Sequence, residues 1–130
     1  MASDREIAFM TSGGLDSSAC ACVGAYILKN KKLNNKIKTI CIGLEGGTDE
    51  KYAKIVADHI NSDHMHIICT EDEFIDCAEN QVTGIIESYD ITTNRASVPQ
   101  YISAKKIRNL TNCKVVIVGD YADEVCGGYN

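Results

Sequence analysis

Residues 11–18, Thr-Ser-Gly-Gly-Leu-Asp-Ser-Ser, carry the strongest chemical signal in the chain. The two glycines let a ligand approach the backbone, the three serines supply hydroxyl donors, and a helix that follows would present unpaired N–H groups to an anion. The carboxylate of Asp16 would repel phosphate unless a cation lay between them. The octet therefore predicts a site for a polyphosphate together with Mg²⁺.

The octet is distinct from two other phosphate-binding loops. A Walker loop needs a Lys after its second Gly and the dinucleotide fingerprint needs a third Gly, and this sequence has neither. The structural alternative is a glycine turn before an ordinary helix, with Asp16 or Ser17 as the N-cap. We favour the phosphate site because glycines, serines and a carboxylate occur together within the octet.

The segments around the octet alternate between two patterns. Short apolar runs predict buried strands at residues 7–10, 36–43, 66–69 and 115–118. Strands that alternate with helices predict an α/β fold, a Rossmann-like parallel sheet with right-handed crossovers and helices on both faces. The glycine-bearing loops after the first, second and fourth strands would then meet at the carboxyl edge of the sheet and converge on one nucleotide.

Between the strands, apolar residues recur at helical spacing. The pattern predicts helices over residues 17–29, from 48 or 49 to 60, over 71–87 with a break near 79–84, and over 98–109. Pro99 would stand in the first turn of the last helix, where its missing N–H is tolerated. The polar stretch 89–97 is predicted to be irregular.

Length and composition restrict the class of protein. The chain has 130 residues, of which 45% are hydrophobic, and one Pro, which indicates a folded globular domain. No apolar run is long enough to span a membrane, and no signal peptide opens the chain. The net charge of −5 argues against a nucleic-acid partner, because phosphate contacts need a basic face.

Cysteine and histidine usage indicates no transition-metal site. The seven cysteines form no Cys-x-x-Cys pair, and Cys20 and Cys22 would point to different faces of their helix. We expect buried reduced thiols in a cytoplasmic protein. His64 and His66 could share one face of a strand, but together with His59 they lack the Cys or carboxylate that would complete a ligand set.

Further motifs extend from Ser3 to the end of the chain. They are Ser3-Asp4, Ile-Gly-Leu-Glu-Gly at 42–46, Val-Ala-Asp-His-Ile at 56–60, the stretch 89–97, and Asp123-Glu124 followed by Gly-Gly-Tyr at 127–129. In this order and spacing, the octet and these motifs resemble the synthetase domain of the glutamine-hydrolysing asparagine synthetases. That family belongs to the N-type ATP pyrophosphatase (PP-loop) superfamily, whose fold is adenine nucleotide alpha hydrolase-like.

The resemblance implies a reaction. ATP and aspartate would form a β-aspartyl-adenylate and release pyrophosphate, and ammonia would then attack the activated carbonyl to give asparagine and AMP. The chain would thus be an AMP-forming amide ligase that uses ATP and Mg²⁺. Other PP-loop enzymes activate different carbonyl groups, so the acceptor stays open at this point.

The resemblance also implies the residues of the site. The residues that would bind ATP come from three loops, and they are Thr11, Ser12, Gly13, Gly14, Leu15, Asp16, Ser17, Ser18, Ile42, Gly43, Leu44, Val118 and Gly119. Asp16 and Asp123 would hold Mg²⁺. The implied catalytic residues are Arg95, Asp120 and Asp123, and the implied substrate contacts are Thr92, Thr93, Asp120 and Glu124. For Arg95 the alternative is an ordinary surface ion pair.

The last loop departs from the family pattern. The family usually has Ser-Gly-Glu-Gly-Ser/Ala-Asp-Glu over the positions that are 118–124 here, so Asp120 replaces a Glu, Tyr121 a Gly and Val118 a Ser. The shorter side chain at 120 would move a carboxylate by about 1 Å, a shift that catalysis often does not tolerate. Tyr121 would either fill part of the substrate pocket or rule out a left-handed backbone. The alternative function is a catalytically impaired nucleotide-binding module.

The two ends of the chain suggest further partners. Ala2 stands where the family's glutaminase domain would present a Cys, and the chain stops at Asn130, before the C-terminal part of the family's synthetase domain. We expect residues 1–130 to form one truncated synthetase-like domain without a glutaminase. A separate glutaminase or a C-terminal half would then complete it, and the uncovered apolar face predicts a homo-oligomer.

Overall fold

A computed structural model describes residues 6–31 and 36–128. Its strands form one parallel sheet in the order β3–β2–β1–β4, with bounds β1 (Ile7–Met10), β2 (Lys38–Leu44), β3 (Asp63–Cys69) and β4 (Val115–Ile117). The predicted parallel α/β sheet is therefore confirmed. The chain moves outward from β1 to β3 and returns on the other side of β1, so the strand order reverses between β1 and β4.

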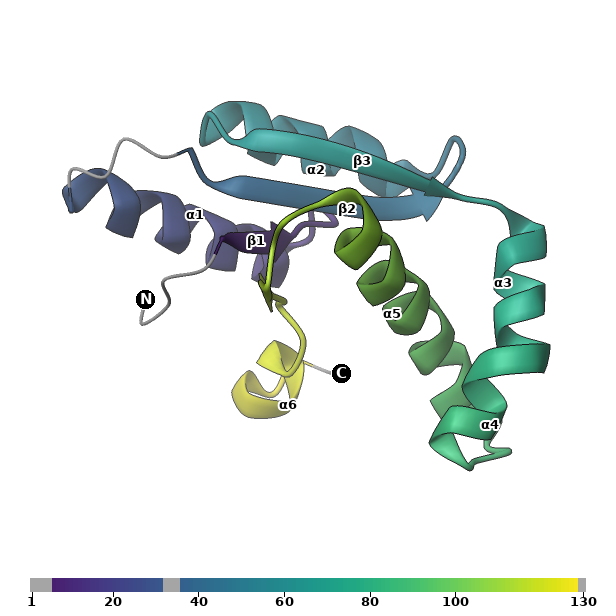
Figure 1. Ribbon diagram of the computed structural model, residues 1–130. Helices are drawn as coiled ribbons and strands as arrows, with labels where there is room; N and C mark the ends of the chain where they lie inside the picture. Colours follow the sequence, from purple (N-terminus) through teal and green to yellow (C-terminus); the bar gives the residue numbers. More distant parts are fainter. Residues whose placement is uncertain (1–5, 32–35, 129–130) are drawn as a thin grey trace.

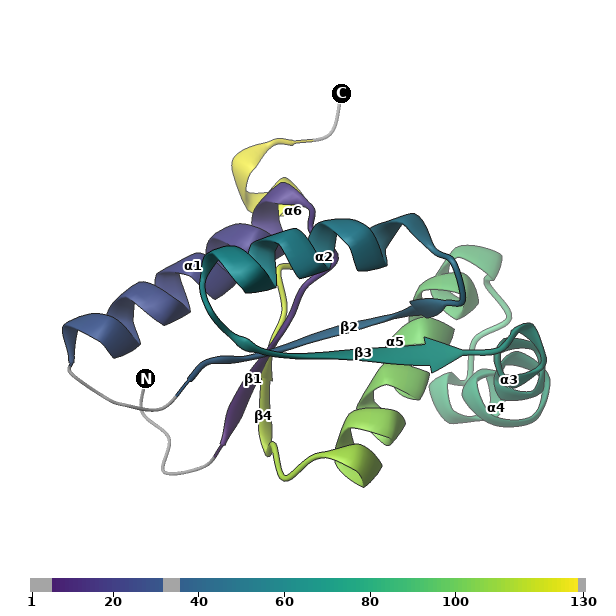
Figure 2. The same ribbon diagram turned by 90° about the horizontal axis from the view of Figure 1, so that it is seen from above.

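Helices cover both faces of the sheet, as predicted (Figure 1). Figure 2 shows α1 and α2 on one side of the sheet and α5 on the other. The helices are α1 (Leu15–Asn30), α2 (Thr48–His59), α3 (Glu71–Cys77), the π-helical turn η1 (Ala78–Val82), α4 (Thr83–Ile86), α5 (Ile91–Leu110) and α6 (Ala122–Cys126). None of the helices in the described part of the chain has the length and hydrophobicity needed to cross a membrane.

Each face of the sheet has its own hydrophobic core. Successive side chains of a strand point to opposite faces. Accordingly, Ala8 of β1 belongs to the cluster that contains Ile107 of α5, whereas Phe9 belongs to the cluster that contains Ala21 of α1. A third cluster, around Val82, joins α3 and η1 to α5. These clusters fix α1 and α5 on either side of β1.

The helix that precedes β4 is longer than predicted. Most of the stretch 89–97 is helical rather than irregular, because α5 begins directly after Asp90. The Asp90 carboxylate caps this helix by accepting hydrogen bonds from the backbone N (2.7 Å) and Oγ1 (2.8 Å) of Thr93. Pro99 therefore lies inside the helix and not in its first turn. It deprives the Arg95 carbonyl of a helical donor, and Arg95 is exposed, so water can replace that donor.

The start of β3 and the predicted break near 79–84 are the two other places where the structure refines the sequence prediction. β3 begins at Asp63 and not at residue 66, because Asp63 already pairs with Lys38 at the start of β2. The irregularity predicted near 79–84 is present as the π-helical turn η1. There the hydroxyl of Thr83 donates to the carbonyl of Ala78 at 2.8 Å. The motif residues 2–4 and 129 lie outside the described part of the chain.

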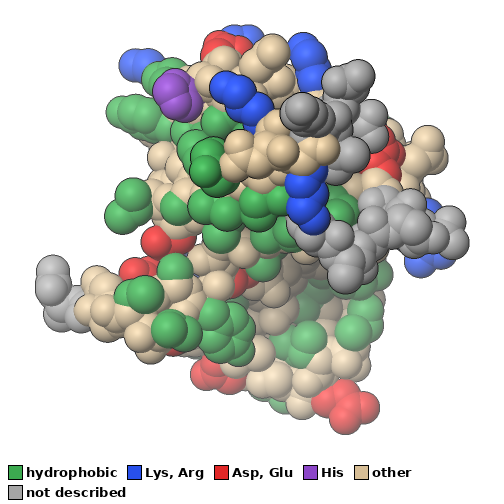
Figure 3. Space-filling view, turned by 90° about the vertical axis from the view of Figure 1, so that its left-hand side faces the viewer, with side chains coloured by type: hydrophobic (Ala, Val, Ile, Leu, Met, Phe, Trp, Pro, Cys, Tyr) green, Lys and Arg blue, Asp and Glu red, His purple; other side chains and the backbone are tan. Residues whose placement is uncertain are grey.

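β4 is an edge strand of the sheet, and apolar side chains at and beyond its end are exposed. Val116 is 37% exposed and Val118 is 42% exposed. Figure 3 shows hydrophobic side chains gathered on one face of the molecule, above a hollow. Self-association through such a face stays a prediction.

Candidate functional site

An open pocket of about 1010 Å³ brings together the segments after β1 and β4 with β2 and α5. It lies where the strand order reverses, which is the usual ligand site of open parallel sheets. Eight of the residues predicted to bind ATP line it: Thr11, Ser12, Gly14, Asp16, Ser17, Ile42, Val118 and Gly119. The predicted catalytic and substrate residues Asp120, Asp123 and Glu124 line it as well.

The turn between β1 and α1 leaves the N-terminus of α1 without a side-chain cap. The N-cap is Gly14, so the alternative of an N-cap at Asp16 or Ser17 is wrong. Instead, Ser17 Oγ lies 3.1 Å from Ser12 Oγ and 3.3 Å from the backbone N of Ser12. The hydroxyl of Ser18 donates to the carbonyl of Gly14 at 2.6 Å. The turn is thus held by its own serines, and the helix N-terminus stays available to an anion.

Gly13 is required by packing against α2. Its φ is +85°, and a Cβ at this position would overlap Tyr52, with the backbone carbonyl carbon of Tyr52 only 2.6 Å away. Gly13 does not line the pocket. This glycine therefore lets α2 approach the turn, whereas the sequence suggested that it lets a ligand approach.

Gly119 brings the two loops of the pocket into direct contact. A Cβ on Gly119 would lie 2.7 Å from the backbone N of Ser17, too close for any larger residue. The chain after β4 therefore packs on the first turn of α1. This contact joins residues about a hundred positions apart in the sequence, and it sets the pocket residues of the two loops side by side.

Three carboxylates that line the pocket come from α6 and the residues just before it, namely Asp120, Asp123 and Glu124. Tyr121 has φ +73°, so the suggestion that a Tyr rules out a left-handed backbone here is wrong. Its side chain is 76% exposed. The carbonyl of Asp123 accepts hydrogen bonds from the backbone N of Gly127 (2.9 Å) and of Gly128 (3.1 Å). These two bonds end α6 and keep the chain that follows next to Asp123.

Several predicted site residues lie outside the pocket lining. Thr93 has both its N–H and its hydroxyl bonded to Asp90, and these hydrogen bonds lower the pKa of the Asp90 carboxyl. Arg95 is exposed and makes no ion pair with any described residue, so the surface ion pair suggested as its alternative is absent there. The other residues that do not line the pocket are Gly13, Leu15, Ser18, Gly43, Leu44 and Thr92.

One wall of the pocket was missed from the sequence. It is the face of α5 that carries Ala96, Pro99, Gln100, Ser103, Ala104 and Ile107. All of these residues except Ala96 lie within the helix predicted over residues 98–109, so their helical spacing was a visible signal, but that spacing does not show that the face lines a pocket.

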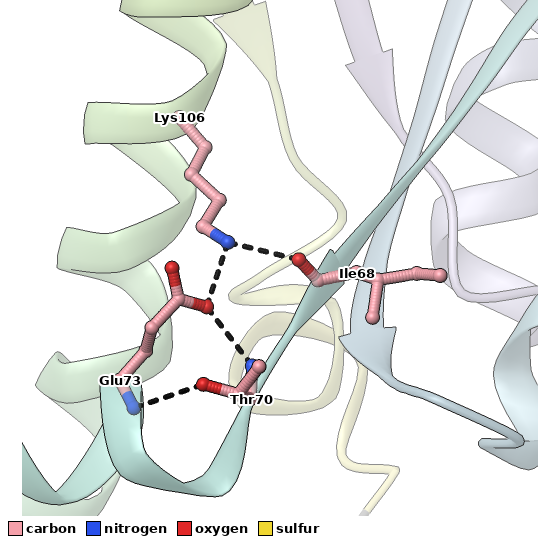
Figure 4. Close-up of polar contacts among 4 residues, drawn as sticks. All are labelled: Ile68, Thr70, Glu73 and Lys106. Atoms are coloured by element: carbon pink, nitrogen blue, oxygen red, sulfur yellow. Dashed lines mark hydrogen bonds and ion pairs between the residues drawn. The ribbon is translucent and has the colours of Figure 1, made fainter.

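A polar cluster ties this wall to the end of β3. Nζ of Lys106 donates to the carbonyl of Ile68 and to Oε2 of Glu73, each at 2.8 Å (Figure 4). The same Oε2 accepts from the N–H of Thr70 at 2.9 Å, and the N–H of Glu73 donates to Thr70 Oγ1 at 3.2 Å. These two bonds form a capping box at the start of α3. The hydrogen bond from Lys106 to Glu73 lowers the pKa of the Glu73 carboxyl and raises the pKa of the Lys106 amine.

The carboxylates of the pocket fit Mg²⁺ only together with a phosphate ligand. Asp16 and Asp123 both line the pocket. Within residues 6–31 and 36–128, no group of three or more His, Cys, Asp or Glu side chains could hold a metal by itself. Mg²⁺ commonly takes one or two protein carboxylates plus phosphate oxygens and water. The donor set therefore matches a metal that binds with a polyphosphate.

Two of the histidines contact residues on neighbouring elements. Nδ1 of His64 lies 2.9 Å from the hydroxyl of Thr39, and burial lowers the pKa of His64. Nδ1 of His66 lies 3.2 Å from a carboxylate oxygen of Glu50.

The cysteines are all free thiols, as predicted. Cys41, Cys69, Cys77 and Cys113 are buried, Cys20 and Cys22 are half-buried, and Cys126 is exposed, contrary to the prediction that the thiols are buried. Burial raises the pKa of Cys41, which lines the pocket, to about 11, so this thiol stays protonated at neutral pH.

Sequence comparisons with known proteins identify one family. The family model described as asparagine synthase matches residues 1–130. The chain is 42% identical over 130 residues to the glutamine-hydrolyzing asparagine synthetase of Zea mays and 40% identical over 126 residues to that of Homo sapiens. These alignments cover 97% of this chain but 22% of each relative, so the chain spans about a fifth of their length.

Solved structures with a similar fold are more distant in sequence. The NH3-dependent NAD synthetase of Campylobacter jejuni has a TM-score of 0.52 at 18% identity, covering 99% of this chain and 53% of that one. A predicted subunit of tRNA methyltransferase from Methanocaldococcus jannaschii has a TM-score of 0.50 at 20% identity, covering 92% and 55%. At these identities the likeness shows the fold alone.

Proposed function

This chain belongs to the asparagine synthase family, and on that premise we propose that it is the ATP-binding part of a ligase that forms asparagine. The proposed substrates are ATP, aspartate and ammonia. Ammonia would be supplied free or by a separate glutaminase. The reaction would activate the β-carboxyl group of aspartate as an adenylate before ammonia displaces AMP.

The observation that carries this proposal is the contact between the turn after β1 and the turn after β4. Gly119 leaves no room for a Cβ against Ser17, so both turns face one pocket. One turn offers an uncapped helix N-terminus, which suits phosphate, and the other offers carboxylates. A pocket with both features suits a nucleoside triphosphate bound with a divalent cation.

The proposed chemistry follows from these groups. A carboxylate oxygen of aspartate attacks the α-phosphorus of ATP, the bond to the bridging oxygen breaks, and pyrophosphate leaves with its negative charge. The N–H groups at the start of α1 and the hydroxyls of Ser12 and Ser17 would bind that leaving group. Mg²⁺, when bound by Asp16 and Asp123, would neutralise charge on the phosphates. Ammonia then attacks the acyl carbon, and AMP leaves.

The test is pyrophosphate release from Mg·ATP, measured with and without aspartate and ammonia. We expect release that depends on aspartate, and AMP and asparagine in equal amounts once ammonia is added. Replacing aspartate with glutamate, which is one methylene longer, is the matched control and should lower release strongly. Release that ignores the amino acid would contradict the proposed acceptor, and no release would contradict ligase activity by this chain alone.

A second candidate, a nucleotide-binding module without ligase activity, is favoured by the segment before α6. Asp120 is shorter than the Glu usual in the family, and Tyr121 holds a left-handed backbone that normally suits Gly. Replacing Asp120 with Glu and Tyr121 with Gly separates the two candidates. A gain of aspartate-dependent release would show that these residues limit the reaction, and would also exclude the need for a separate C-terminal half.

A further inference from the structure

His64 lies near the start of the edge strand β3, and one of its two ring nitrogens is unused. Its Nδ1 lies 2.9 Å from the hydroxyl of Thr39, the residue opposite on the neighbouring strand β2. Its Nε2 is buried, and no described residue offers it a hydrogen-bond partner. A buried nitrogen without a partner has lost its hydration and gained nothing in return, so it calls for an explanation.

A chain of hydrogen bonds indicates which ring nitrogen carries the proton. The hydroxyl of Ser62 donates to the carbonyl of Ala57 at 3.3 Å, so its oxygen accepts the bond from Thr39 Oγ1, 2.7 Å away. Thr39 thereby uses its one proton and accepts a bond from His64 Nδ1. Nδ1 therefore carries the proton of the neutral ring. A second proton would have to sit on Nε2, as a buried charged N–H without an acceptor among the described residues.

These bonds attach the C-terminal end of α2 to the sheet. Ser62 donates to the carbonyl of Ala57 a second time, through its backbone N at 2.9 Å. Figures 1 and 2 show α2 running along β2 and β3. One helical turn before Ala57, α2 meets the turn after β1, where a Cβ on Gly13 would lie 2.8 Å from the backbone N of Ala53. The helix that packs on the phosphate turn is thus the helix that the bonds of Ser62 hold in place.

The charges around His64 do not compensate for its burial. The charged or titratable groups that act on it are His66 on its own strand and Glu50, Lys54 and Asp58 on α2. Burial lowers the pKa of His64 first, His66 and Lys54 lower it further, and the two carboxylates oppose them. On β2, the thiol of Cys41 has a pKa of about 11 and stays uncharged. A lowered histidine pKa stabilises the fold fully above the ordinary value of 6.5, and this contribution is lost as the pH falls through the folded-state pKa.

We propose that Thr39, Ser62 and His64 form an acid-sensitive latch, which holds α2 against the turn after β1 while His64 is neutral and releases the helix when the ring takes up a second proton. None of the three residues lines the pocket, so the latch acts on the phosphate turn only through α2. The consequence for phosphate binding rests on the proposed function, whereas the latch itself does not.

NMR on the full chain between about pH 7.5 and 5.5 tests the latch, because histidine rings take up protons in this range. The ring signal of His64 should titrate below its ordinary pKa of 6.5. Over the same titration, the amides of α2 should lose about threefold or more of their protection from hydrogen exchange, corrected for the intrinsic effect of pH. The amides of α5, on the other face of the sheet, should keep theirs. A ring that takes up its proton at or above pH 6.5, or α2 protection that ignores this proton, would overturn the inference.

Two asparagine variants identify the histidine responsible. In His64→Asn, the amide can donate to Thr39 in place of Nδ1 but cannot become charged, so α2 protection should no longer depend on pH. His59→Asn is the matched control, since His59 is exposed at the end of α2, and it should keep the dependence. Protonation of His66 would strengthen its contact with Glu50, so it cannot imitate a loss in acid. A dependence that survives in His64→Asn would contradict the latch, and the ring titration decides if this variant does not fold.

Pyrophosphate affinity, measured by calorimetry, separates the latch from the proposed function. Relative to His64→Asn at the same pH, the unchanged chain should lose about threefold or more of its affinity between pH 7.5 and 5.5, and the titration of pyrophosphate itself cancels in this ratio. A constant ratio alongside a loss of α2 protection would show that the latch does not reach the phosphate turn. If the unchanged chain binds no pyrophosphate at any pH, the proposed function is wrong, and hydrogen exchange alone decides the latch.

Discussion

Two strand-to-helix turns of this protein are built in opposite ways. After β3, the chain enters α3 through a capping box in which Thr70 and Glu73 satisfy one another's backbone N–H groups, and Lys106 anchors the same Glu73. After β1, the chain enters α1 through Gly14, with no side-chain cap. Both turns stand at the carboxyl edge of one parallel sheet. The turn after β3 is therefore closed by side chains that stabilise it, whereas the turn after β1 leaves helix N–H groups uncapped, as the proposed phosphate site requires.

The largest effect on activity should come from the carboxylate in the open turn. We expect Asp16→Asn to lower pyrophosphate release from Mg·ATP about a hundredfold, or about 2.7 kcal/mol, because the cation on the phosphates loses a ligand. Asp72→Asn is the control, since Asp72 occupies the first turn of the closed helix α3. Steady-state kinetics with both variants would contradict the comparison if they lost activity equally.

Replacing glycines with alanine tests how tightly α2 packs against the open turn. Gly13→Ala should lower the free energy of unfolding by about 3 kcal/mol, because it combines a left-handed backbone with an overlap on the backbone of Tyr52. Gly46 also has a positive φ, +73°, but nothing lies within 4 Å of its Cβ position, so Gly46→Ala should cost about 1 kcal/mol. Urea denaturation measures both. Similar losses would mean that α2 does not constrain the turn.

Hydroxyl removal should have opposite consequences in the two turns. Thr70→Ala in the closed turn should lower the free energy of unfolding by about 1 kcal/mol and leave ATP affinity unchanged, because it deletes a helix cap. Ser12→Ala in the open turn should weaken ATP binding severalfold and lower the free energy of unfolding by less than Thr70→Ala does, because its hydroxyl holds the turn through long hydrogen bonds to Gly14 and Ser17 and caps no helix. Thermal unfolding and calorimetry on the same two variants decide the point, and parallel effects would remove the distinction between the turns.

The smallest effect should be a dependence on pH in the closed turn. The pKa of Glu73 is lowered below its ordinary value of 4.5, first by the hydrogen bond from Lys106. A lowered pKa stabilises the fold above that ordinary value, and the contribution disappears as the pH falls through the folded-state pKa. The difference in melting temperature between the unchanged chain and Glu73→Gln should thus be constant near neutral pH and shrink below pH 4.5. A difference that persists at the acid end would show that charge is not its cause.

Local patterns predicted much of this molecule because their causes are local. The octet at 11–18 lies in a strand-to-helix turn as its glycines and serines suggested, and the four strands follow the apolar runs. The start of α5 was missed because Pro99 resembles a first-turn residue, while the actual cap is Asp90. The extent of β3 was missed because pairing with β2, and not hydrophobicity, decides where it begins.

By itself, the sequence determined the family, the parallel α/β fold and the turn where phosphate chemistry is proposed, since each depends on residues close together in the chain. Only the tertiary structure decided that Gly13 serves the packing of α2, that Gly119 joins the loops after β1 and β4, and that α5 forms a wall of the pocket. It also showed that Thr39 is satisfied where Thr11 is not. Such facts depend on which distant atoms the fold brings within a few ångströms, and no local pattern encodes that distance.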